Sequence, residues 1–499
     1  MAQAPPPPDP DRARVRALLW DACELEHQLM LQYLFAAFTL KKFPDETCTP
    51  AQLEAVRRWT STIMVVARQE MEHLALANGM LSAIGEDPFF ARDNIPVQSW
   101  YYLGGNRARA EAAEAPDAPA PLDIPFLWEK FTPAAIRRFV CAESPAWKDV
   151  VGTDMYPSWC FAGPDPGSGL GGAGLPLSRS HVDALSGAAR GAPGEVPVHP
   201  GTIPELYGHV NGLLQAHPEW FRGVPDRQVF VPVEYQLSVI KITDPLSAGA
   251  AIDQIVEEGE GIDAPPGYPS HFARFWRVHR ELAHMERQGF QPALPVRENP
   301  VPDDGWRPYT RAVSELLDYA YVTLLYVLTS LYRNYQDRAR PPYPTQALQN
   351  VAFGPFMTMV IRPVCEVLVH LRTHPDGRET AGPVFRLPPE EERMIWPRPY
   401  PPCQVAPGAE PVPGPPHGNP SPEERDRLAA RLDDIDFILA RMDRLCARVG
   451  ELAGGGESAG LAGLRGALVP QAPLEWARER LEYVRESTEA MANNVRRLY

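Results

Sequence analysis

The chain has 499 residues, of which 44% are hydrophobic and 22% charged, values that are ordinary for a globular protein with more than one domain. Its formal net charge is −15 and it has no run rich in lysine or arginine, which argues against a nucleic acid or a membrane surface as a partner.

Cysteine usage and the absence of targeting segments predict a cytoplasmic protein. The seven cysteines are scattered without a CxxC pair, which favours reduced thiols over a disulfide framework. The N-terminus, MAQAPPPPDPDR, lacks the charged and apolar segments of a secretion signal. No uncharged apolar run reaches the roughly 18 residues that would cross a bilayer.

Apolar periodicity predicts a mainly helical chain. A first helix is expected over residues 11–42 with Asp11 as its N-cap, and a second over 49–85, capped by Thr49 and ended by Gly85. The short connection between them predicts antiparallel packing. Further helices are expected at 132–144, 202–217, 244–261, 270–288, 312–336, 346–372, 421–450 and 474–499, and one or two short strands at 228–242.

The second helix places an acid and an imidazole on its apolar face. Glu70 and His73 share a stripe with apolar residues at helical spacing, whereas Glu72 falls outside it. An ExxH pair is commonly a surface or capping pair, but a buried unpaired carboxylate costs several kcal/mol, so this one needs a compensating partner.

The first helix has a parallel feature, because Glu26 and Tyr33 lie on its apolar stripe. One glutamate and one ExxH on facing helices make half of a carboxylate-bridged dimetal site in a four-helix bundle. Tyr33 taken alone is a core residue; beside a metal it could hydrogen-bond a ligand or a reacting oxygen species.

The other half of such a site should come from residues 251–275. This segment offers Glu257, Glu258, Glu260 and His271, but periodicity does not choose between the acids. There is no second ExxH, since Tyr268 stands three residues before His271. The alternatives are an acidic helix end and a histidine that hydrogen-bonds at a helix start.

Five segments in order resemble the ferritin-like family of iminophenylpyruvate dimer synthases, which includes chromopyrrolate-type synthases. They are ELEHQLMLQYLFAAF, RQEMEHLALANGMLSAIGEDP, TIPELYGHV, IVEEGEG with SHFARF, and AGPVFRLP. The resemblance runs from about residue 12 to 388. It implies a mainly α fold, with a ferritin-like four-helix bundle core, long irregular insertions and additional C-terminal helices.

The resemblance also implies a ligand set and a division of the chain. The metal ligands would be Glu26, Glu70, His73, His271 and an acid of EEGEG, with Glu257 and Glu260 at the family's constant acidic positions. The expected parts are a metal-binding core with an insertion at 86–240, a helical pair, a proline-rich linker and a C-terminal helical segment, at 1–305, 306–395, 396–420 and 421–499.

The function that these features favour is that of a non-haem dimetal oxidoreductase that uses O₂. The ions would be two irons, with manganese or another divalent metal as alternatives, and Tyr33 would be the catalytic side chain. The substrate would be a small amino-acid-derived molecule of secondary metabolism. Alternatives are oxidative dimerisation of an aryl-pyruvate imine and a non-catalytic metal- or ligand-binding scaffold. A homodimer is left open.

Overall fold

The computed structural model of the chain is dominated by helices. It describes residues 9–43, 48–99, 101–103, 123–145, 200–221, 238–261, 269–303, 305–333, 344–389, 391, 435–454, 459–470 and 472–498, with isolated positions at 112, 117, 175, 178 and 229. The expected linker at 396–420 and most of the expected strand segment at 228–242 lie outside these residues.

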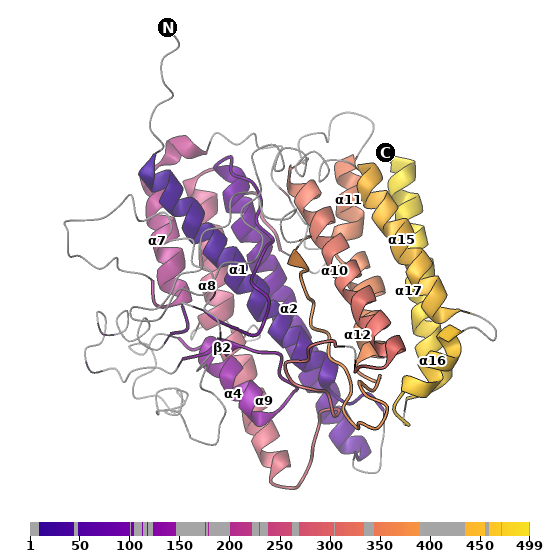
Figure 1. Cartoon of the computed structure of the whole chain (residues 1–499). Coiled ribbons are helices and arrows are strands. Elements are labelled where there is room, and N and C mark those ends of the chain that lie inside the picture. The colour runs from indigo at the N-terminus through magenta and orange to yellow at the C-terminus, as the bar shows by residue number, and fades with distance from the viewer. Residues whose placement is uncertain are drawn as a thin grey trace.

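Two long helices, α1 (Pro10–Thr39) and α2 (Pro50–Ala83), pack side by side and form the centre of the molecule (Figure 1). The N-cap of α1 is Asp9 rather than the predicted Asp11, because Pro10 takes the first helical position and Asp9 accepts a hydrogen bond from the Asp11 amide at 3.0 Å. Thr49 caps α2 as predicted: its hydroxyl accepts from the Gln52 amide, and its own amide donates to the Gln52 side chain. Every residue of α1 from 17 to 39 is buried, so this helix is surrounded on all sides.

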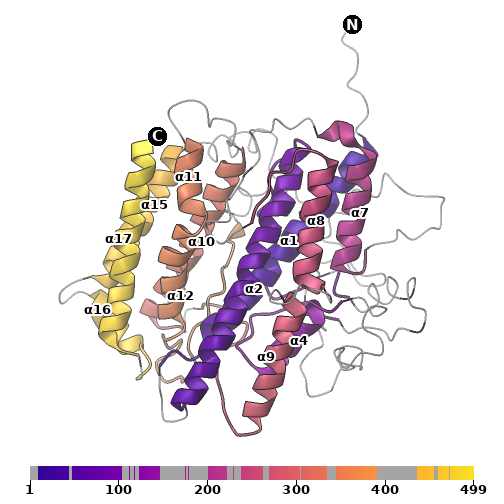
Figure 2. The same cartoon turned by 180° about the vertical axis from the view of Figure 1, so that it is seen from behind.

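Four shorter helices complete the bundle around α1 and α2: α4 (Pro133–Ala142), α7 (Ile203–Ala216), α8 (Pro245–Glu260) and α9 (His271–Glu286). Figures 1 and 2 show α8 directly above α9, and α7 above α4. α7 packs against α8 and α1, and α4 packs against α9. The third and fourth positions of the bundle are therefore each filled by two short helices that meet near mid-height.

The C-terminal half is a second layer of helices beside the bundle (Figure 2). Its central helix, α10 (Pro308–Arg333), contacts α11 (Pro344–Ala352), α12 (Arg362–Leu368), α15 (Ile435–Ala453) and α16 (Ala459–Ala467), and α15 packs along α17 (Leu474–Leu498). One π-helical turn, Met357–Ile361, precedes α12. Where the sequence predicts one helix over 346–372, the chain thus forms three helical pieces.

Regular β structure is minimal within the described residues. Strands β1 (Val97–Gln98) and β2 (Pro125–Phe126) pair antiparallel, and a short 3₁₀ turn at Pro218–Trp220 follows α7. The fold is therefore mainly α, as the sequence predicts.

Two segments, Pro308–Arg333 and Ala347–Leu368, are long and apolar enough to cross a membrane, but 78% and 67% of their apolar windows are buried inside the protein. Packing within the second layer accounts for their apolar character.

The cysteines depart in one respect from the expectation of reduced thiols. Cys23, Cys48, Cys365 and Cys446 are free, whereas Cys141 takes part in a disulfide.

Candidate metal centre

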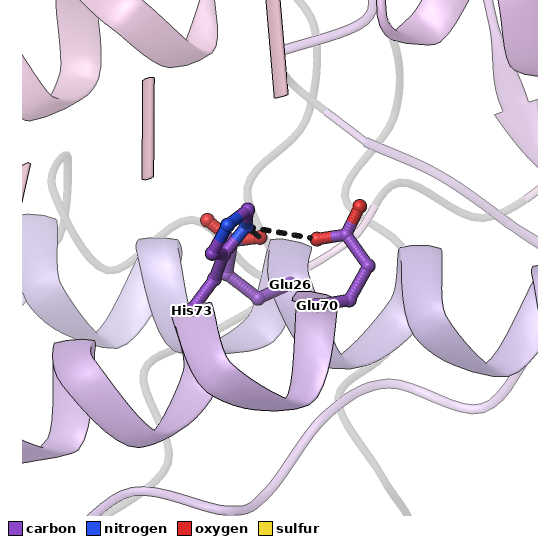
Figure 3. Close-up of side chains that lie close together, drawn as sticks. All are labelled: Glu26, Glu70 and His73. Atoms are coloured by element: carbon purple, nitrogen blue, oxygen red, sulfur yellow. Dashed lines mark ion pairs between the residues drawn. The ribbon is translucent and has the colours of Figure 1, made fainter. Parts of the chain in front are cut away.

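Glu26, Glu70 and His73 meet in the buried space between α1 and α2 (Figure 3). The His73 Nδ1 atom lies 3.3 Å from a Glu70 oxygen and 3.5 Å from a Glu26 oxygen. Each of the three side chains is 3% exposed or less. The apolar stripes that predicted these residues therefore converge on one cluster of two carboxylates and an imidazole.

A second cluster shares Glu70 with the first and adds Glu143 and His271. The His271 Nδ1 atom lies 2.9 Å from Glu70 Oε1 and 3.6 Å from Glu143 Oε2. In each cluster the candidate ligand atoms lie within 4.8 Å of one another. Glu70 stands between the two groups, one oxygen towards His73 and the other towards His271, as a bridging carboxylate would.

The breaks in the outer helices bring the second cluster together. Glu143 is the C-cap of α4, and His271 is the first residue of α9. α4 and α9 pack against each other, and Gly259 near the end of α8 lies beside the Glu143 carboxylate. The acid and the histidine that one ExxH would supply from a continuous helix thus come from two helix ends.

Two buried tyrosines donate hydrogen bonds to these carboxylates. Tyr207, on α7, donates to Glu26 Oε1 at 2.7 Å, and Tyr33 donates to Glu143 Oε1. The Tyr33 ring is held by Phe139 and Phe275, at centroid distances of 4.7 and 4.8 Å. Each hydroxyl leaves one oxygen of its carboxylate facing the cluster, so the tyrosines orient the candidate ligands.

Of the three acids at the end of α8, Glu258 is the one that contacts the clusters. Its Oε2 atom lies 3.2 Å from His73 Nε2, on the opposite side of the ring from Glu26 and Glu70. Glu257 is exposed, and Glu260 is buried at the helix end but belongs to neither cluster. Glu258 is therefore placed to orient His73 by accepting a bond from its outer nitrogen.

Glu143 and Tyr207 are the residues that the sequence interpretation missed. Glu143 continues the apolar spacing of Ile136, Phe139 and Val140 on α4, which is the same signal that identified Glu70. Tyr207 lies among the buried residues of α7 in the same way.

The clustered acids and imidazoles shift one another's ionisation. Burial raises the pKa of Glu70 to about 7, against the opposing effect of His271. Burial would lower the pKa of His271, but Glu70 and Glu143 outweigh it and raise that pKa to about 9. Burial also opposes the charged form of Glu26, yet His73 and Tyr207 hold its pKa below the usual value. The buried carboxylates thus favour the charged form of both histidines, His73 and His271, by raising their pKa.

The residues present suit divalent cations. Carboxylate oxygens and imidazole nitrogens are the ligands of non-haem iron and manganese sites. Both ring nitrogens of His271 and the Oε1 atom of Glu70 are buried without a hydrogen-bond partner among the described residues, although two of these atoms approach within 2.9 Å. Buried polar atoms without a hydrogen-bond partner are costly in a core, and these atoms could instead coordinate a bound cation.

Comparison with known proteins gives the class. The model of the Ferritin-like family matches residues 19–280, which contain all five cluster residues, so the chain belongs to the ferritin-like family. Proteins with this fold commonly bind metals. The resemblance seen in the sequence is confirmed.

Two curated relatives with named activities are similar to this chain. One is a dichlorochromopyrrolate synthase from Lentzea aerocolonigenes, 28% identical over 77% of this chain and 36% of the relative. The other is a 2-imino-3-(indol-3-yl)propanoate dimerase from Chromobacterium violaceum, 27% identical over 76% of this chain and 35% of the relative. The chain thus spans about a third of the length of these relatives. A ferritin-like protein of known structure from Caulobacter vibrioides is 17% identical, with a TM-score of 0.38 over 69% of this chain and 93% of the other.

Proposed function

We propose that the protein is a dimetal oxidoreductase that holds two iron ions and uses O₂ to oxidise a small amino-acid-derived molecule. The observation that carries the proposal is the pair of buried carboxylate–histidine clusters joined by Glu70. Glu26 and His73 would hold one ion, Glu143 and His271 the other, and Glu70 would bridge them. Iron in such a site supplies electrons to O₂.

The residues around the clusters would orient the ligands, exchange a proton and exclude water. Tyr207 and Tyr33 fix the carboxylates of Glu26 and Glu143, and Glu258 fixes the ring of His73. The Tyr33 hydroxyl lies at the second cluster, where it can give or take a proton as the substrate reacts. The Phe139 and Phe275 rings exclude water beside it.

A second candidate reaction is the oxidative coupling of two aryl-pyruvate imines. It is favoured by the relatives' names, a chromopyrrolate synthase and an indolyl imine dimerase. Two imines would each lose one electron and one proton to O₂ and form a new carbon–carbon bond. This chain matches only about a third of each relative. The coupling reaction is therefore proposed as one specific case of the oxidation of an amino-acid-derived molecule.

Metal analysis tests the proposal directly. Protein purified under reducing conditions and reconstituted with Fe²⁺ should retain about two iron ions per chain, as a bundle site of this kind requires, and should change its absorption spectrum when O₂ is added. Glu70→Ala should lose both ions, and Glu143→Ala should lose one. Retention of no iron by the wild type would overturn the proposal.

Glu257→Ala is the matched control. It removes an acid from the same segment as Glu258, but its side chain is exposed, so the variant should bind iron as the wild type does. If Glu257→Ala loses iron and Glu143→Ala keeps two ions, the proposed ligand set is wrong.

A further inference from the structure

A cavity of about 1100 Å³ lies away from the metal clusters, where the bundle meets the second layer. One wall comes from the end of α1, the start of α4 and the end of α9 with the segment after it. The facing wall comes from residues 370–378 and 469–470, which follow α12 and α16. Lys41 lies fifteen residues beyond Glu26, with about 20 Å of α1 between them. Arg137, the lining residue nearest to Glu143 along α4, lies six residues before it, about 9 Å of helix. The second wall lies beyond the part of the chain that matches the ferritin-like family.

Backbone hydrogen bonds hold these walls in place. The Lys41 amide donates to the Pro292 carbonyl at 2.9 Å, and the Leu294 amide to the Thr39 carbonyl at 2.8 Å. Opposite, the Val469 amide donates to the His370 carbonyl at 2.9 Å, and the Arg372 amide donates to Ala467 at 2.8 Å. The cavity is thus formed by paired segments of the fold and not by loose loops.

Positive charge gathers in this cavity although the whole chain carries a net charge of −15. Its described lining contains five cations and one acid, the exposed Glu286. The cations are Lys41, Lys130, Arg137, Arg372 and Arg378. Lys130, Arg372 and Arg378 form no ion pair with any described residue, and Glu298 acts on Lys130 only from a longer range. A hollow of one sign of charge concentrates ligands of the opposite sign.

Other groups on the lining suit an organic anion. The N-cap of α4, Thr132, and its first two residues, Pro133 and Ala134, line the cavity, and a helix start favours negative charge. Phe43 is half-buried on the lining and offers an aromatic surface. His370 also lines the cavity; its Nδ1 donates to the Glu366 carbonyl at 2.8 Å, and its buried Nε2 has no partner among the described residues.

From these observations we infer that the cavity is a binding site for a small organic anion, an aromatic carboxylate or phosphate, separate from the metal centre. Lys130, Arg372 and Arg378 bind the acid group, and Phe43 packs on the apolar part. Burial lowers the pKa of His370 to about 4, so its ring is neutral at pH 7 and Nε2 accepts a hydrogen bond from a hydroxyl or N–H of a suitable ligand.

Calorimetric titration of the full-length protein tests the site with phenylacetate, phenyl phosphate and, as a neutral match, phenylacetamide. At least one of the two anions should bind saturably and more tightly than the amide. The anion with the higher affinity indicates whether the natural ligand is a carboxylate or a phosphate. Lys130→Gln combined with Arg378→Gln should weaken anion binding by about tenfold or more, as expected for the loss of charged hydrogen bonds.

Arg444→Gln combined with Arg448→Gln is the control, because it removes the same charge from exposed positions on α15. This variant should bind the anions within about twofold of the wild type, since distant exposed charges are screened. Equal binding of the amide and the anions, or unchanged anion binding in the cavity variant, would overturn the inference. Because these measurements need no metal, their outcome does not depend on whether the protein binds iron.

Discussion

At the scale of single residues, Glu70 and Glu26 show what sequence periodicity can and cannot predict. The stripe on α2 predicted that Glu70 and His73 face the core together, and they do so at 3.3 Å. On α1, burial alone does not distinguish Glu26, because Glu24, His27 and Gln28 are buried as well. What distinguishes Glu26 is its neighbours, His73 and Tyr207, and neighbours on distant segments are not visible in a one-helix pattern.

The tyrosine hydroxyls permit a test at this scale. In Tyr207→Phe and Tyr33→Phe, a carboxylate loses the bond that orients it while the ring keeps its packing. We expect each variant to fold and to bind iron about 10- to 100-fold more weakly, as is typical when the partner of a metal ligand is removed. Competition with a chelator measures this affinity.

Tyr309→Phe is the control for the tyrosine variants. Its hydroxyl also donates a single bond, to the Leu452 carbonyl at 2.9 Å, but in the second layer. If all three variants lowered iron affinity equally, the effect would be on stability and not on the orientation of Glu26 and Glu143.

At the scale of elements, the broken helices explain why half of the site was harder to predict. The sequence signals of α4, α8 and α9 were each recognised, and their observed bounds agree with the expected ranges to within about two residues. The pairing of α4 with α9 could not be read from them, because residues 143 and 271 are 128 positions apart and two other helices, α7 and α8, lie between them in the sequence. Local sequence patterns predict which face of a helix is buried, but they do not predict which other helix end packs against that face.

A second element, the extended segment 381–388, joins the two layers and is the AGPVFRLP motif. Arg386 pairs with Asp318 on α10, while Arg92 and Asn94 from the bundle side donate to the Phe385 and Leu387 carbonyls. Gly382 lies so close to α1 that an added Cβ would stand 2.4 Å from the ring of Phe35, which is fully buried. The motif therefore serves close packing.

Gly382→Ala should consequently destabilise the protein. The Phe35 ring must move within a filled core, which costs about 1–3 kcal/mol of unfolding free energy. Gly212→Ala, on α7, meets nothing within 4 Å and should stabilise by about 0.5–1 kcal/mol, because alanine restricts the unfolded chain. Denaturant titration of both variants measures the difference. A stable Gly382→Ala would mean that the segment does not pack on α1 as described.

At the scale of the whole molecule, the second layer is built around α10, and Arg441 of α15 makes a buried polar connection to it. Arg441 is 6% exposed; it pairs with Glu391 at 2.9 Å and donates to Thr323 of α10 at 3.1 Å. Its guanidinium also lies over the rings of Tyr319 and Tyr326, at 4.1 and 4.8 Å. The candidate metal ligands, by contrast, all come from the bundle, so they and Arg441 lie in different layers.

This division predicts that Arg441→Met weakens the second layer and leaves the site intact. Loss of a largely buried ion pair and of the stacking on two rings should lower the unfolding free energy by about 2–4 kcal/mol. Iron content per folded chain should equal that of the wild type. Arg448→Met is the matched control: it removes an exposed arginine that lies over the same Tyr319 ring, at 4.8 Å, and should cost less than about 1 kcal/mol. If Arg441→Met instead lost iron while remaining folded at low temperature, the layers would be coupled, and the bundle alone would not determine the metal centre.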